Sequence, residues 1–167
     1  MKKIGNKILV ASFIALYLLS ISEAKAQRSS HAAELKAFLV EADAAQVELQ
    51  NGKVERYKSL WSHADNVSIT GGFGGTIERG WAAVSKRLDW AATQFSEGKN
   101  TIERLIVYSN GDLAYVVQLE HIRFKAPATG ADATRDFRVT MVFRKEAGKW
   151  KIVHRHADNN ITTQPAA

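Results

Sequence analysis

The segment KWKIVHRHAD near the end of the chain brings together residues that could transfer protons or bind a metal ion. Its candidate groups stand at alternate positions: His154, His156 and Asp158. Alternate side chains of a β-strand share one face, and the apolar Trp150 and Ile152 have the same parity. The pattern therefore predicts that both imidazoles face the protein interior, while Arg155 lies on the opposite face.

Three roles are open for these two histidines. Because the unperturbed pKa of histidine is about 6.5, either ring could act as a general acid or base, with Asp65 or Asp158 orienting it. Both could instead be structural, one hydrogen-bonded to a neighbouring strand and the other half-solvated at a strand end. As a pair they could also bind zinc, but no second spaced motif supplies the remaining ligands. A metal site is the least favoured interpretation, and no cofactor is expected.

A second cluster of polar and aromatic residues, WSHAD, spans residues 61–65 after a predicted helix. His63 is a candidate catalytic residue, although a histidine at a helix C-terminus also interacts favourably with the helix dipole. The candidates for binding a flat, partly apolar substrate are Tyr57, Trp61, Phe73, Trp81 and Asp158. Aromatic residues at helical spacing more often belong to a core, so we expect only some of them to touch a ligand.

The elements that must position these residues follow from hydrophobic periodicity. Apolar residues at intervals of three and four predict helices over residues 29–49, 53–61 and 81–95. Alternation and turn signals predict a short strand at 67–70, the glycine-rich turn GGFGG and a return strand at 76–79. Four long strands are predicted over residues 101–108, 113–125, 136–145 and 149–156. Helices followed by an antiparallel meander are typical of an α+β domain with a curved sheet.

The first 26 residues have the pattern of a secretory signal peptide, with early lysines, an apolar run over 8–21 and Ala24-Lys25-Ala26. Cleavage after Ala26 would remove four lysines and one glutamate, lowering the formal net charge from +6 to +3. So mild a charge predicts neither a nucleic-acid partner nor a membrane surface. We expect a periplasmic or secreted protein with one domain over residues 27–160 and a tail over 161–167. Thiol chemistry is excluded because the chain has no cysteine.

Most of the mature chain resembles the SnoaL-like branch of the nuclear transport factor 2-like, or cystatin-like, superfamily. The segments that carry the resemblance are residues 60–75, 80–95, 111–117 and 142–158. The resemblance implies an open cone, in which a curved antiparallel sheet wraps around three N-terminal helices and encloses an internal pocket. It also implies that WSHAD lies at the pocket mouth, and that a homodimer forms through the outer face of the sheet.

The resemblance leaves the function open, because the superfamily includes both enzymes and non-catalytic modules. One implied function is a cofactor-independent lyase or isomerase with histidine acid/base chemistry, as in members resembling scytalone dehydratase. The other is a ligand-binding or homodimeric association module, as in the calmodulin-dependent kinase II association domain. A ketosteroid-isomerase-like site is disfavoured, since no acid of the predicted strands is expected inside an apolar site. Those acids are Glu103, Asp112, Glu120 and Asp136.

Overall fold

The computed structural model describes residues 30–159, and the chain divides into two compact units, residues 1–37 and 38–167. In the first unit residues 30–37 are helical, and Ser30 Oγ donates a hydrogen bond to Glu34 Oε1 at 3.1 Å. The predicted signal peptide and the whole of the predicted tail lie outside the described residues. Within the described residues no helix is long and apolar enough to span a membrane.

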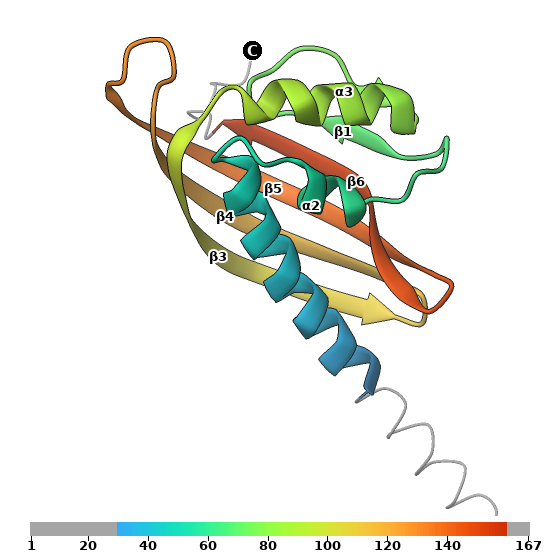
Figure 1. The fold of residues 1–167 in the computed structure, drawn as a ribbon. Coiled ribbons are helices and arrows are strands. Elements are labelled where there is room, and N and C mark those ends of the chain that lie inside the picture. Colours follow the sequence, from blue (N-terminus) through green and yellow to red (C-terminus); the bar gives the residue numbers. More distant parts are fainter. Residues whose placement is uncertain (1–29, 160–167) are drawn as a thin grey trace, which may run out of the picture. The chain divides into compact units, whose positions relative to one another are not determined.

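The second unit contains helices first and a large sheet after them (Figure 1). Residues 38–49 are helical. The elements that follow are α2 (Glu55–Ser59), β1 (Ser68–Thr70), β2 (Glu78–Arg79), α3 (Trp81–Ala92), β3 (Ser96–Asn110), β4 (Leu113–Lys125), β5 (Asp132–Glu146) and β6 (Lys149–Asn159). Every element predicted from periodicity is therefore present, and β3, β5 and β6 are longer than predicted.

Six strands form one sheet in the order β2-β1-β6-β5-β4-β3. The four long strands pair as an antiparallel meander, as predicted, while the short β1 joins β6 in parallel. The sheet is strongly twisted and the helices of this unit cover one of its faces (Figure 1). The prediction of an α+β fold with a curved, unclosed sheet is confirmed.

A β-bulge in the last strand changes which residues of β6 face the helices. Val142 pairs with His154, whereas the next residue of β5, Phe143, pairs with Ile152, so Val153 is an extra residue. Side chains of a strand alternate between faces, and one inserted residue therefore reverses the parity of everything that follows it. Before the bulge Trp150 and Ile152 are buried, as predicted.

After the bulge the predicted orientation of the β6 residues is wrong. Arg155 is only 8% exposed on the helix-covered face, together with the buried Ala157. His154, His156 and Asp158 take the opposite parity and lie on the outer face of the sheet. The physical reason is the pairing of β6 with β5, which no pattern within β6 itself contains.

Candidate functional site

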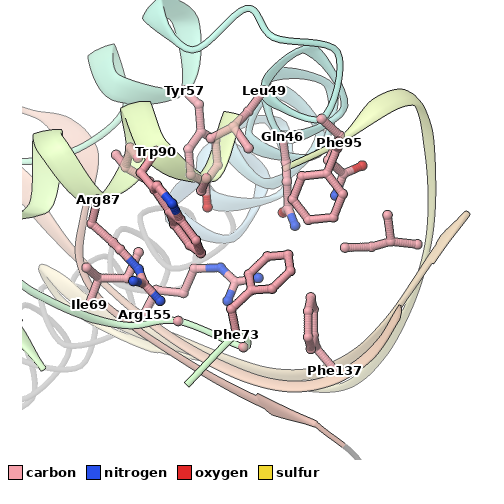
Figure 2. A pocket seen from close by; sticks show the side chains of 16 residues that line it. Gln46, Leu49, Tyr57, Ile69, Phe73, Arg87, Trp90, Phe95, Phe137 and Arg155 are labelled. Carbon is pink, nitrogen blue, oxygen red and sulfur yellow. The ribbon is translucent and has the colours of Figure 1, made fainter. Parts of the chain in front are cut away.

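A cavity of about 70 Å³ lies between the helices and the helix-covered face of the sheet (Figure 2). Its apolar wall includes Leu49, Tyr57, Ile69, Phe73, Trp90, Phe95, Ile122 and Phe137. Its polar side chains are Gln46, Gln50, Arg87 and Arg155. An apolar pocket with a few polar groups is the usual form of a small-molecule site.

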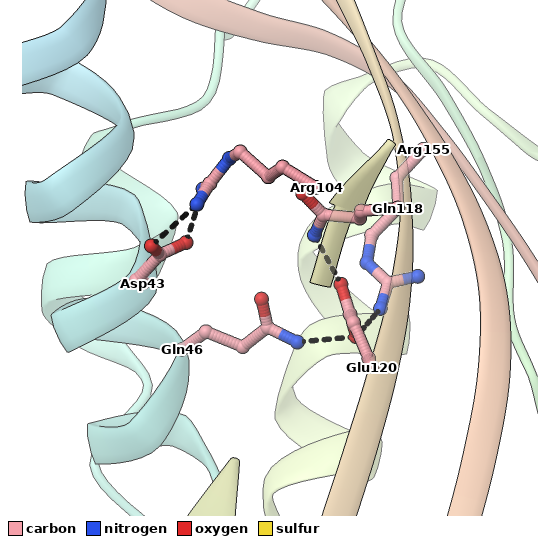
Figure 3. A network of polar contacts seen from close by, with 6 residues as sticks. All are labelled: Asp43, Gln46, Arg104, Gln118, Glu120 and Arg155. Carbon is pink, nitrogen blue, oxygen red and sulfur yellow. Dashed lines mark hydrogen bonds and ion pairs between the residues drawn. The ribbon is translucent and has the colours of Figure 1, made fainter. Parts of the chain in front are cut away.

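The polar end of the cavity is organised by one buried carboxylate, that of Glu120 on β4, which is 0% exposed (Figure 3). Its Oε2 accepts hydrogen bonds from Arg155 Nη2 at 2.6 Å and from Gln46 Nε2 at 2.7 Å. Its Oε1 accepts one from Gln118 Nε2 at 2.8 Å. These three donors offset much of the free-energy cost of removing the carboxylate from water. A buried carboxylate without such partners would bear that cost in full.

Arg155 carries its positive charge into the cavity wall. Burial by itself lowers the pKa of the Arg155 guanidinium, but the Glu120 carboxylate and the Tyr57 hydroxyl together outweigh that effect, and the pKa lies above its ordinary value. The Glu120–Arg155 pair is therefore a buried ion pair with little net charge. It can still donate hydrogen bonds from the guanidinium to an oxygen atom in the cavity.

Tyr57 from α2 points its hydroxyl towards the Arg155 guanidinium (Figure 2). Burial raises the pKa of Tyr57 to about 12, although the Arg155 charge opposes the shift. The phenol is therefore protonated at neutral pH. Its hydroxyl oxygen is buried without a hydrogen bond of good geometry, and so is Oε1 of Gln50, which also lines the cavity.

The glycine-rich loop GGFGG, residues 71–75, closes one side of the cavity and presses against its walls. A Cβ on Gly72 would come within 2.4 Å of the Phe137 ring, and a Cβ on Gly71 within 2.7 Å of Arg87 Nη2. Between these glycines Phe73 stacks against other aromatic rings, with a centroid separation of 5.4 Å from Phe95. The glycines therefore permit a close approach of the loop, and they hold one aromatic side chain in the cavity.

Arg87 is the second guanidinium of the cavity and comes from α3. Its Cζ lies 4.3 Å from the centroid of the Trp90 ring, and its Nη2 donates to the carbonyl oxygen of Gly74 at 2.8 Å. No carboxylate pairs with it among the described residues. Unlike Arg155, it therefore brings an uncompensated positive charge to the cavity.

Comparison with known protein families identifies the domain. The sequence model of the SnoaL-like domain family matches residues 40–158, well over half of the 167-residue chain. The chain belongs to the SnoaL-like domain family. The predicted resemblance is thus confirmed, and the matched segment contains the residues that line the cavity. The comparison with curated proteins gives no match.

Solved structures share the fold of this SnoaL-like domain. A suggested dehydratase of the nuclear transport factor 2-like family from Streptomyces avermitilis is 21% identical, with a TM-score of 0.66 over 78% of this chain and 99% of that one. A ketosteroid isomerase-like protein from Erwinia carotovora is 15% identical, with a TM-score of 0.65 over 78% and 96%. A suggested calcium/calmodulin-dependent protein kinase II association domain from Xanthomonas campestris is 19% identical, with a TM-score of 0.61 over 75% and 85%. At these identities the likeness shows the fold alone.

Two of the predicted substrate-binding residues, Tyr57 and Phe73, line the cavity of the SnoaL-like domain. Trp61 is fully buried but does not line it. His63 stacks on Trp81 with ring centroids 3.9 Å apart, and neither ring lines the cavity. Asp65 is exposed.

The remaining predicted site residues lie on the outer face of the sheet. His154 Nδ1 is 2.9 Å from Ser68 Oγ, and partial burial followed by the neighbouring His156 lowers the pKa of His154. Asp158 accepts two hydrogen bonds of 2.9 Å from Arg138. Over residues 30–159 no group of three or more His, Asp and Glu side chains is arranged to hold a metal ion.

Sequence reasoning missed the polar end of the cavity. Glu120 and Arg155 were both expected outside the interior, and the expectation that no strand acid is buried in an apolar site is wrong for Glu120. The alternation of β4 contains no usable signal for Glu120, because Leu113, Tyr115 and Val117 make the opposite face of the strand equally apolar. No signal existed for Arg155 either, because its orientation depends on the bulge.

Proposed function

We propose that the protein binds a small, partly apolar molecule that carries a carbonyl or hydroxyl group, and that it does so in the cavity of the SnoaL-like domain. One observation carries the proposal: Tyr57 Oη and Gln50 Oε1 are buried at the cavity without a hydrogen bond of good geometry, although the Arg155 guanidinium lies beside the Tyr57 hydroxyl. Buried polar groups are nearly always hydrogen-bonded, and each unmet group costs about 1–3 kcal/mol. A carbonyl or hydroxyl oxygen of a ligand would accept from the Tyr57 hydroxyl, and a ligand hydroxyl would also donate to Gln50 Oε1.

The test is a thermal-shift and calorimetric screen of small ketones, phenols and alcohols against the mature domain. Binding that weakens about tenfold in Tyr57→Phe, with the fold unchanged by circular dichroism, supports the proposed site. Val40→Ala is a suitable control, because Val40 is 64% exposed and does not line the cavity. Ligands that bind equally well to wild type and Tyr57→Phe would contradict this location of the polar end.

Lyase or isomerase activity on the bound molecule is the second candidate function. A protonated Tyr57 hydroxyl beside the Arg155 guanidinium could stabilise an oxyanion that develops on the substrate, as preorganised donors do in enolising enzymes. The fold is also shared with proteins described as a suggested dehydratase and as ketosteroid isomerase-like, which favours this class of chemistry. Loss of turnover in Tyr57→Phe, with ligand affinity largely retained, would support it.

The histidine mechanism remains a separate proposal. His154 and His156 lie on the face of the sheet opposite the cavity, so they could contribute only at a site formed on the outer face. A double His154→Ala, His156→Ala variant would lose turnover if they transfer protons. It would retain full turnover if the chemistry belongs to Tyr57 and Arg155.

Export of the protein also remains a proposal, supported by the sequence pattern of residues 1–26. Expression of the full chain in a bacterial host, followed by cell fractionation and N-terminal sequencing, tests it. The expected product begins at Gln27 in the periplasm or the medium. A product that retains Met1 in the cytoplasm would contradict it.

A further inference from the structure

The charges at the cavity point to the chemical class of the ligand. We propose that the ligand is a small keto or hydroxy carboxylate, whose carboxylate binds Arg87 while its second oxygen binds Tyr57 and Arg155. This inference rests on the proposed binding function and adds the anionic group.

The two guanidinium groups of the cavity differ in their charge balance. Arg155 is paired with Glu120 at 2.6 Å, so that end of the cavity has little net charge. Arg87 is positioned by the Trp90 ring and by a backbone carbonyl, neither of which neutralises it. No acidic side chain lines the cavity, and an anionic ligand would therefore meet its opposite charge at Arg87.

The polar groups at the Glu120–Arg155 end of the cavity, where the two charges balance, are suited to the uncharged oxygen of such a ligand. Arg155 N–H groups and the protonated Tyr57 hydroxyl can donate to a keto or hydroxyl oxygen, and the unpartnered Gln50 Oε1 can accept from a hydroxyl. The aromatic residues that line the cavity, which include Trp90 beside Arg87, suit a flat apolar body. A ligand with only one polar end would leave either the Arg87 charge or the buried Tyr57 oxygen unmet.

The size of the cavity limits this ligand to a small molecule. Its volume of about 70 Å³ is below the roughly 150 Å³ of an apolar cavity that binds benzene. Short keto and hydroxy acids therefore match the cavity better than acids with an aromatic ring, for which we expect Phe73 to move. Phe73 lies between two pairs of glycines, and its side chain is only half-buried.

Calorimetry with matched acid and neutral probes tests the proposal. The probes are 4-oxopentanoate, in which two methylene groups separate the keto group from the carboxylate, and 4-hydroxybenzoate, each compared with its uncharged amide. We expect the acids to bind at least about tenfold more tightly than the amides. We also expect Arg87→Gln to remove this preference and Arg87→Lys to retain part of it.

The matched control is Lys86→Gln, which removes the same charge from the neighbouring residue of α3. Lys86 is exposed and does not line the cavity, so its loss should change the affinity for the acids by less than about twofold. Equal losses in Lys86→Gln and Arg87→Gln would show a general charge effect and overturn the specific site.

The outcomes also separate this inference from the proposed binding function. Amides that bind as tightly as the acids would overturn the carboxylate class and leave small-molecule binding in place. If no acid, amide, ketone or alcohol binds, both proposals fail. Weaker binding of acids and amides alike in Arg87→Gln would show that Arg87 only supports the loop through Gly74, which also overturns the inference.

Discussion

Glu120 and Arg155 are the residues whose positions most affect both stability and the cavity. Both side chains are buried, Glu120 completely and Arg155 with 8% exposure, and each is the other's principal counterion. Removal of one partner from a buried pair leaves an uncompensated charge, whereas replacement of both by apolar groups of similar volume is often tolerated. Single and double substitutions of Glu120 and Arg155 therefore measure how much this buried ion pair contributes to the stability of the protein.

We expect Glu120→Gln to lower the free energy of unfolding by about 3 kcal/mol, because Arg155 then remains buried without a counterion. The double change Glu120→Leu, Arg155→Met should recover most of that loss. Chemical denaturation at pH 7 measures both. As a matched control, Asp158→Asn breaks an exposed ion pair with Arg138 and should change stability little. A loss in Asp158→Asn as large as that in Glu120→Gln would contradict the special role of burial.

His154 predicts a pH dependence of stability. Its pKa is lowered in the folded protein by partial burial and by His156, whereas the unfolded chain has an ordinary pKa of about 6.5. The unfolded state therefore binds a proton first as the pH falls below about 6.5, and stability decreases in that range. We expect the loss of stability between pH 7.5 and pH 5 to be smaller in His154→Asn than in wild type. Equal losses would contradict the lowered pKa.

At the scale of elements, the loop with residues 71–75 determines the size of the cavity. Phe73 fills space beside Phe95 and Phe137. The neighbouring Gly71 and Gly72 lie so close to the cavity wall that a larger residue would not fit at either position. The side chain is half-buried, so it can leave the cavity at a smaller cost than a core phenylalanine.

We expect Phe73→Ala to enlarge the cavity and to shift binding from short acids towards acids that contain an aromatic ring. Calorimetry should show at least about a fivefold change in the ratio of the two affinities, because the variant no longer has to displace a ring. Ile77→Ala is the control, since Ile77 follows in the same loop and is 62% exposed. An unchanged ratio in Phe73→Ala would show that another residue limits the size.

At the scale of the whole molecule, the outer face of the sheet has an apolar patch that a monomer would leave in water. The outer-face patch consists of Ile106, Tyr108, Leu113, Tyr115, Val117 and Val142, which share one face by strand register. Contiguous exposed apolar surface of this kind marks interfaces. The Arg138–Asp158 ion pair and the His121–Asp136 hydrogen bond lie on the same face, where a second copy of the chain could meet polar partners.

A homodimer through the outer-face patch therefore remains our proposal for the assembly. We expect native mass spectrometry to give twice the mature mass at micromolar concentration, and Tyr115→Asp to give the monomer, because it buries an unpaired charge in the interface. Ile77→Asp provides the comparison, since it adds the same charge to an exposed apolar position outside the patch. A wild-type monomer would refute the proposal.

The sequence by itself determined the elements, because helical and strand periodicities are local properties. The helices and the meander agree with prediction, and β4 spans the predicted residues 113–125. Tyr57 and Phe73 were also recognisable as candidates, since the first lies on an apolar helix face and the second interrupts a glycine run.

Only the tertiary structure decided which side chains face the cavity. A single extra residue, Val153, is accommodated by pairing with β5 and turns Arg155 inward and His154 outward. The partners of Arg155 come from positions that are distant in sequence, Glu120 and, through it, Gln46. A charged residue considered alone is predicted to lie on the protein surface. Its burial becomes favourable only when strand register and helix packing bring a counterion to hydrogen-bonding distance.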